Sequence, residues 1–167
     1  MAFPGLFAAE DDFYVARLRT AEASVLRRVF SEMAALVGEP MGGDEVLGRL
    51  FPDAYRDAPE EAAEFRRLTE DDLRAGKVDQ VGVVLATLPE SGGEVRLDDE
   101  QAEAWLRALT DARLALGARM QISDDTDLSD ELDEAALRDP TGARAMQLSV
   151  YGYLTYLQES LVEAISE

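Results

Sequence analysis

Apolar residues in this chain recur mostly at steps of three and four, which is the spacing of one face of an α-helix. The clearest case is residues 95–120, where one face carries Ala102, Trp105, Leu106, Leu109, Ala112, Arg113 and Leu116. Asp98 and Gln101 have the residue types and spacing of a capping box at the start of this segment. The pattern predicts one long helix that carries the only Trp of the chain and packs against the other elements.

The same spacing predicts further helices on both sides of this segment. One is expected over about 21–37 and a short one over 44–51, which Pro52 ends. Another starts at Pro59 and breaks or bends near Leu68, where Thr69 and Asp72 resemble a new cap, and a second helix then runs to about Leu88. The last helix is expected over about 141–165, with an inner side made of Met146, Val150, Tyr153, Leu154, Leu157, Leu161 and Ile165.

The remaining segments are short or polar. Residues 13–18 (FYVARL) are β-prone and have 95–97 as a plausible partner, which gives a two-stranded ribbon beside the helices. Residues 1–12 are expected to form a loose arm. Residues 123–134 hold seven acids and no base, so an exposed acidic loop with about one helical turn is expected there. The predicted fold is mainly α: one bundle-like domain of five to seven helices over 13–167.

Composition excludes several classes of function. The chain has 167 residues, of which 47% are apolar, so it is long enough to bury one ordinary core. It contains no Cys and no His. Ser-His-Asp and Cys-His catalysis, thiolate metal sites and nearly all zinc hydrolase arrangements are therefore excluded. We assign no catalytic residue, metal ligand or cofactor, and we predict a protein that is not an enzyme.

Charge and hydropathy narrow the choice of partners. The net charge of −19 comes from 35 acids against 16 bases, and such a field repels a phosphate backbone. Nucleic-acid binding is therefore disfavoured. Residues 1–9 lack the positive region of a signal peptide, and the longest apolar run, 81–88, is far too short to cross a bilayer. We expect a cytoplasmic protein without a membrane segment, and the sequence leaves a homodimer open.

Two acidic motifs suggest metal chemistry, but a simpler interpretation is favoured for each. Gly42-Gly43-Asp44-Glu45 matches the core of the diguanylate cyclase signature, but it precedes a helical pattern rather than the tip of a β-hairpin. We interpret it as a turn and helix cap. Residues 124–134 could offer oxygen ligands to Ca²⁺ or Mg²⁺, but they lack the Gly and Glu positions of an EF-hand loop. Solvated charge or a flexible interaction segment is favoured.

The remaining candidates are six residues that could contact a partner or an anion. Arg66, Arg67 and Arg113, with Asp111 nearby, could form an anion or partner site. The alternative that we favour for Arg113 is an interhelical ion pair with a carboxylate such as Glu64 or Glu159. Three tyrosines lie close together near residue 153, so at least one ring should be exposed, and Tyr156 beside Gln158 could mark a partner surface.

Three segments carry a resemblance to a known family: RRLTEDDLRAGK (66–77), the residues 98–119 through AWLRALTDARLALGAR, and YLTYLQESLVEA (153–164). There the chain resembles an actinobacterial family of unknown function, from about Thr20 to the C-terminus. Thr110 departs from the family, whose members often have Asn there. The resemblance implies a bacterial cytoplasmic protein, genes that lie beside that of the Clp-protease adaptor ClpS, and sometimes an inherited label of transcriptional regulator. The positions it singles out are Arg66, Arg67, Trp105, Asp111, Arg113 and Gln158.

Three functional hypotheses follow. The first is a non-enzymatic helical protein that acts through an unidentified protein partner, in a regulatory role linked to Clp proteolysis by the resemblance. The second is a transcriptional regulator that binds DNA. The third is a metal-dependent enzyme that uses carboxylates alone, with the ion held by the acidic stretch or by Asp44 and Glu45. The missing residue types and the charge favour the first.

Overall fold

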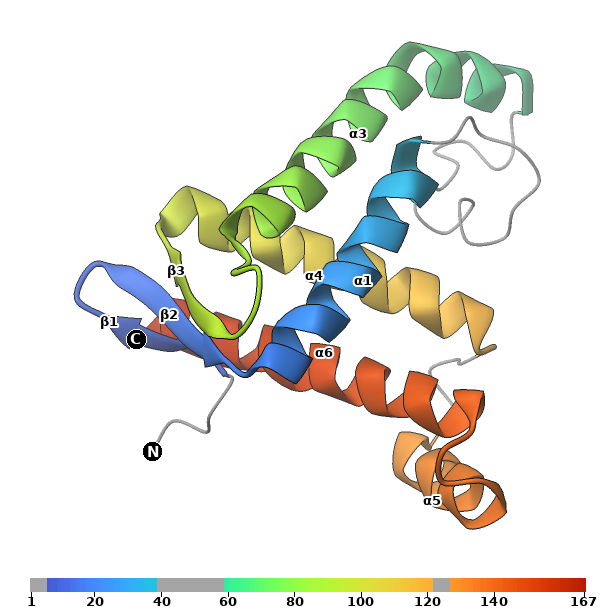
Figure 1. The fold of residues 1–167 in the computed structure, drawn as a ribbon. Helices are drawn as coiled ribbons and strands as arrows, with labels where there is room; N and C mark the ends of the chain where they lie inside the picture. Colours follow the sequence, from blue (N-terminus) through green and yellow to red (C-terminus); the bar gives the residue numbers. More distant parts are fainter. Residues whose placement is uncertain (1–5, 39–58, 122–126) are drawn as a thin grey trace.

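The computed structural model describes residues 6–38, 59–121 and 127–167, with the backbone alone described at 59–71 and 129. Within these ranges the fold is mainly α, as predicted, with five helices and a small antiparallel sheet (Figure 1). The elements are β1 (Ala8–Glu10), β2 (Phe13–Leu18), α1 (Thr20–Gly38), α3 (Pro59–Thr87), β3 (Gly93–Leu97), α4 (Asp99–Arg119), α5 (Leu128–Arg138) and α6 (Ala143–Ser166). The predicted helix at 44–51 and the motif at 42–45 lie outside the described residues.

Helix α4 is the centre of the fold, and its predicted start is confirmed. The Asp98 side chain accepts from the Gln101 N–H at 2.8 Å, and the Gln101 side chain accepts from the Asp98 N–H at 2.9 Å. Trp105 is fully buried, and its indole Nε1–H donates to the Thr87 hydroxyl of α3 at 2.8 Å. Helices α3 and α6 both pack on α4, and α1 crosses in front of α4 and α6 in Figure 1.

The sheet closes one end of the core and is larger than predicted. Strand β2 lies in the middle and pairs with β3, so the expected ribbon is confirmed, with Tyr14 opposite Leu97. Strand β1 adds a third strand, with Ala8 opposite Val15. The predicted loose arm is therefore wrong over its described part, 6–12. Phe7 holds this segment in place because its ring packs edge-on against Trp105, with centroids 5.5 Å apart.

The acidic loop predicted over 123–134 is wrong from residue 128 onward, where the chain forms α5. Asp127 caps this helix by accepting from the Asp130 N–H at 3.1 Å, and Asp130 and Glu131 lie in its first turn. Negative charge at that position interacts favourably with the helix dipole, so these acids stabilise a helix rather than prevent one. Its apolar side joins a small separate cluster that includes Leu128, Leu132, Met120 and Leu148.

Two details of the other helices also differ from prediction. Of the break or bend expected near Leu68, the structure shows a bend: α3 is one helix from Pro59 to Thr87, whose ribbon bends toward its N-terminal end in Figure 1, so the expected second helix is part of the same one. Thr and Asp cost less than about 1 kcal/mol each inside a helix, so they end one only where the chain also turns away. In α6, Met146 and Ile165 were expected inside but are 53% and 38% exposed. Met146 lies where the helices leave a groove.

Candidate partner-binding groove

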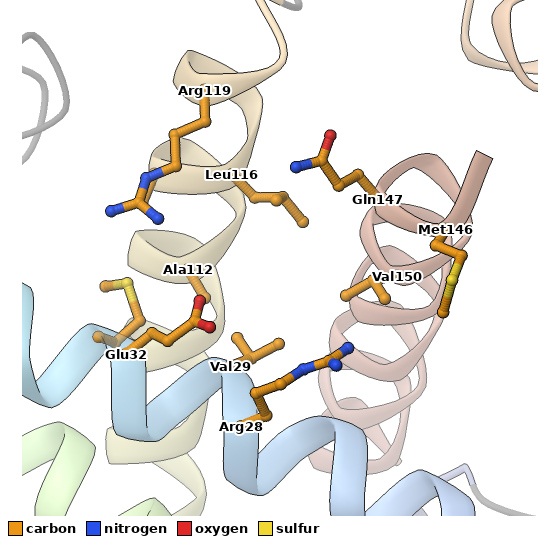
Figure 2. Close-up of a pocket in the computed structure, with 11 residues that line it drawn as sticks. Arg28, Val29, Glu32, Ala112, Leu116, Arg119, Met146, Gln147 and Val150 are labelled. Atoms are coloured by element: carbon orange, nitrogen blue, oxygen red, sulfur yellow. The ribbon is translucent and has the colours of Figure 1, made fainter. Parts of the chain in front are cut away.

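Helices α1, α4 and α6 leave an open groove of about 260 Å³ between them, which we call the three-helix groove (Figure 2). Its floor is apolar and buried or half-buried, and it consists of Val29, Met33, Ala112, Ala115, Leu116 and Val150. Its rim is exposed and consists of Arg28, Glu32, Arg119, Met146 and Gln147. An apolar floor within a polar rim is the general form of a protein-binding surface.

The groove exists because α4 changes side-chain size along its length. In its first half the helix places the large Trp105 ring against Phe7 and Phe30, which fills the space between the elements. Two to three turns later the same side of the helix carries Ala112 and Ala115. A methyl group cannot fill the space between three helices, so a groove remains above Ala112 and Ala115, which are themselves buried in its floor.

The rim differs in charge from the rest of the described surface. Most described arginines lie beside a carboxylate, as Arg17 does with Glu10 and Arg107 with Glu103. Within the described part of the chain, Arg28 and Arg119 make no ion pair. Figure 2 shows them at opposite ends of the groove, with Glu32 on α1 as the single acid among the described lining residues. Two unpaired cations thus flank an apolar floor in a chain whose net charge is −19.

Asp111, one of the predicted contact residues, is buried and forms an ion pair within the protein. It is 7% exposed, and both of its carboxylate oxygens accept from the Lys77 ammonium of α3, at 3.0 and 2.9 Å. This ion pair fastens α3 to α4. Asp111 therefore faces a different helix from Arg113, and the two do not form a common site.

Arg113 and Gln158 are brought together, but as an interhelical link. The Arg113 guanidinium donates to Gln158 Oε1 at 2.7 Å and lies over the Tyr151 ring, 5.4 Å from its centroid. The amide nitrogen of Gln158 in turn donates to the Leu106 carbonyl and the Thr110 hydroxyl of α4, at 3.2 and 2.6 Å. These two bonds fix the amide so that its oxygen faces Arg113.

The prediction of an interhelical ion pair for Arg113 is thus wrong in the type of contact, which is a hydrogen bond to a neutral amide. A link from this residue to another helix is present, but its partner is the Gln158 amide and not Glu159. The side chains of Glu64, Arg66 and Arg67 lie outside the described residues. Tyr156 is 65% exposed, while Tyr151 and Tyr153 are half-buried.

Neither Asp111, Arg113, Tyr156 nor Gln158 lines the three-helix groove, and sequence reasoning missed the residues that do. Arg28 has Glu32 four residues ahead, but the two form no ion pair in the structure. Arg119 offered a usable signal, because no acid lies within four residues of it. The other signal was the change from Trp to Ala along one apolar face of the 95–120 segment.

Metal binding and membrane insertion find no support in the described ranges. No group of three or more Asp or Glu residues there is placed to hold a metal ion. Asp44, Glu45 and residues 122–126 lie outside those ranges. None of the described helices is both long and apolar enough to cross a membrane.

Comparison with known proteins then places the chain in a family. The model of a domain of unknown function, DUF2017, matches residues 4–165. The chain belongs to this family. One relative, the putative oxidative stress regulator AosR of Mycobacterium leprae, is 35% identical over 136 residues, covering 73% of this chain and 58% of the relative. The oxidative stress regulator AosR of Mycobacterium tuberculosis is 33% identical over 141 residues, covering 72% and 57%.

This DUF2017 chain spans less than two thirds of the length of these curated relatives. No solved structure matches it. The resemblance to a bacterial family of unknown function is thereby confirmed, while the neighbourhood with the ClpS gene stays a prediction.

Proposed function

We propose that this DUF2017 chain is a non-enzymatic regulatory protein that acts by binding a protein partner in the three-helix groove. The observation that carries the proposal is the groove itself, an unfilled apolar floor beside exposed arginines on an acidic chain. The names of the mycobacterial relatives support a regulatory role. The absence of His and Cys from the sequence supports a role without catalysis.

The relatives are named for a role in oxidative stress, which raises the question of how a redox signal would reach this chain. An oxidant is usually sensed by a thiolate of lowered pKa, and this chain has no Cys. A regulator built on this chain therefore receives a redox signal through its partner rather than through a thiol of its own. A cytoplasmic location and a link to Clp proteolysis are compatible with this role and stay predictions.

DNA binding is the less favoured alternative because the basic side chains are dispersed and largely paired. Arg138 bonds Glu134, and Arg144 bonds Glu131 and the Met120 carbonyl. Arg27 donates to the carbonyls of Leu88 and Pro89. These contacts use the cations that a phosphate backbone requires, and the net charge of −19 opposes the approach of nucleic acid.

The proposal is tested by blocking the groove without disturbing the fold. Met146→Glu places a charge on the groove rim, and Leu137→Glu makes a similar change at an 87% exposed position of α5 outside the groove. The three immobilised proteins are compared for the proteins they retain from a lysate of the source cells. We expect the wild type and Leu137→Glu to retain the same partner, and Met146→Glu to lose it by about tenfold or more.

Equal retention by both variants would contradict the proposal. A mobility-shift assay at low salt with the same three proteins provides the second arm. A shift of duplex DNA by the wild type that groove variants do not weaken would favour the DNA-binding alternative.

A further inference from the structure

We infer that the partner element held in the three-helix groove is an amphipathic helix with acidic residues beside its apolar stripe. This inference rests on the proposed function and specifies the occupant. It is argued from the form of the groove walls, from its size and from the charge of its rim.

The walls favour a helix over an extended peptide. Extended peptides bind by adding a strand to a free sheet edge or, as polyproline segments, in aromatic-lined grooves, and the described lining of this groove holds no aromatic residue. All three walls of this groove are helices, α1, α4 and α6, whose backbone groups are bonded within each helix. An occupant that buries its backbone there must satisfy its own N–H and C=O groups, which an α-helix does.

The size favours a few inserted side chains over a small-molecule ligand. Small-molecule sites commonly have about 300–1,000 Å³, and this groove has about 260 Å³ with one side open. The floor offers apolar contacts from Val29, Leu116 and Val150, and no charged side chain is buried in it. Apolar residues at i, i+3, i+4 and i+7 of a helix would present the required stripe.

The rim favours acidic residues on that helix. Arg28 and Arg119 are exposed, have no carboxylate partner in the described residues, and flank the floor on two different helices. A guanidinium binds a carboxylate through two parallel hydrogen bonds, which gives direction as well as attraction. Glu32 disfavours acids along the whole length of the occupant, so they are expected beside the two arginines.

The negative charge of the whole chain does not prevent this recognition. The Debye length is about 8 Å at physiological ionic strength, so distant acids are screened while the arginines on the rim act at contact distance. The same reasoning predicts that affinity falls as salt rises, because the contacts of Arg28 and Arg119 are exposed.

The test is a display library of amphipathic helices with a fixed apolar stripe and a free choice of Glu, Gln or Lys at the flanking positions. The library is selected on the full chain, and binders that bind Met146→Glu as well as wild type are discarded. The winning sequence is synthesised, and its affinity is measured by fluorescence anisotropy. The proteins are wild type, Arg28→Glu/Arg119→Glu, and the matched control Arg107→Glu/Arg138→Glu, which has the same change in charge.

We expect Glu to be enriched beside the stripe. The synthetic helix should bind the wild type and the control with similar affinity and the groove variant at least about tenfold more weakly. Enrichment of Lys, no enrichment, or no groove-dependent binder would overturn the inference. Equal binding to the two double variants would also overturn it.

Failure of this inference is distinguishable from failure of the proposed function. If the natural partner is lost on Met146→Glu while selected helices are neutral or basic, the groove binds a partner of different charge. If the natural partner is retained by Met146→Glu, the proposed function itself fails.

Discussion

The two halves of α4 show how one helix can complete a core at one end and leave a surface at the other. In the first half Trp105 is fully buried between Phe7 and Phe30, and the sheet covers that end. In the second half Ala112 and Ala115 face the three-helix groove. The first half contributes to stability. The second half still fastens α3 through Asp111, but its small side chains leave a groove that can serve recognition.

The largest expected effect lies at the closed end. Trp105→Ala removes the ring that contacts Phe7 and Phe30 and the hydrogen bond to Thr87. It should lower the free energy of unfolding by about 3–5 kcal/mol, as deletion of a buried Trp usually does. Urea denaturation followed by circular dichroism measures this. Met146→Ala at the groove rim is the control and should cost less than about 1 kcal/mol, and equal losses would remove the contrast between the two ends.

The next effect concerns the ion pair that fastens α3 to α4. Lys77→Met leaves the Asp111 carboxylate, which is 7% exposed, without its bidentate partner. The free energy of unfolding should fall by about 3 kcal/mol, because a charge left alone inside a protein is costly. The double variant Lys77→Met/Asp111→Leu should recover most of the loss in the same denaturation experiment. A double variant as unstable as the single one would show that packing, not charge, sets the cost.

Enlarging an alanine separates the two halves of α4 most cleanly. Ala108 and Ala115 lie two turns apart on the same helix and both are buried, but Ala115 also lines the groove whereas Ala108 does not. Ala108→Leu should overpack the core and cost about 1–3 kcal/mol. Ala115→Leu should extend into open space and change the free energy of unfolding by less than about 1 kcal/mol. Thermal unfolding of the pair decides this, and equal destabilisation would mean that the groove is as tightly packed as the core.

The smallest effect is a pH dependence at Tyr153. Burial raises the pKa of its hydroxyl above the ordinary value, with the nearby Glu22 adding to the effect. In the unfolded chain the hydroxyl loses its proton near pH 10, whereas in the folded chain it keeps it. The folded state therefore binds more protons, and the free energy of unfolding falls as pH rises above about 10.

Tyr153→Phe should remove the part of the fall in the free energy of unfolding at alkaline pH that the Tyr153 hydroxyl causes. At neutral pH the variant should be as stable as the wild type or up to about 1 kcal/mol more stable, because the buried hydroxyl finds no hydrogen-bond partner in the described residues. Denaturation at pH 7 and at about pH 10.5 measures both effects. The exposed Tyr156→Phe is the control, and the account is wrong if both variants change the pH dependence equally.

Local signals in the sequence predicted most of the helices and strands, because such signals depend only on residues that are neighbours in the sequence. The capping box at Asp98 and Gln101 marked the start of α4, and the β-prone run at 13–18 marked the central strand. Strand β1 was missed because three residues carry no recognisable alternation and its pairing with Val15 needs the folded chain. The acids at 127–131 suggested a loop, but Asp127 caps α5, and Asp130 and Glu131 lie in its first turn.

The groove could not be predicted, because it is a property of three helices and not of any one. Ala112 and Ala115 are buried core residues, and only the placement of α1 and α6 decides that they also line a groove. The spacing of Arg28 and Glu32 permits an ion pair, and only the side-chain positions in the structure show that none forms. The interhelical contact of Arg113 was foreseeable from its position near the apolar face, but its partner depends on how α4 holds the Gln158 amide.

The central claim is that the open half of α4 binds a protein partner, and photocrosslinking in the source cells tests it most directly. A photoreactive benzoylphenylalanine replaces Met146 at the groove rim in one protein and Leu137 on α5 in another. The account predicts a crosslinked partner from position 146 and none from 137, with the product lost when Ala115→Leu fills the groove. Equal products from both positions, or a product at 146 that Ala115→Leu leaves unchanged, would contradict it.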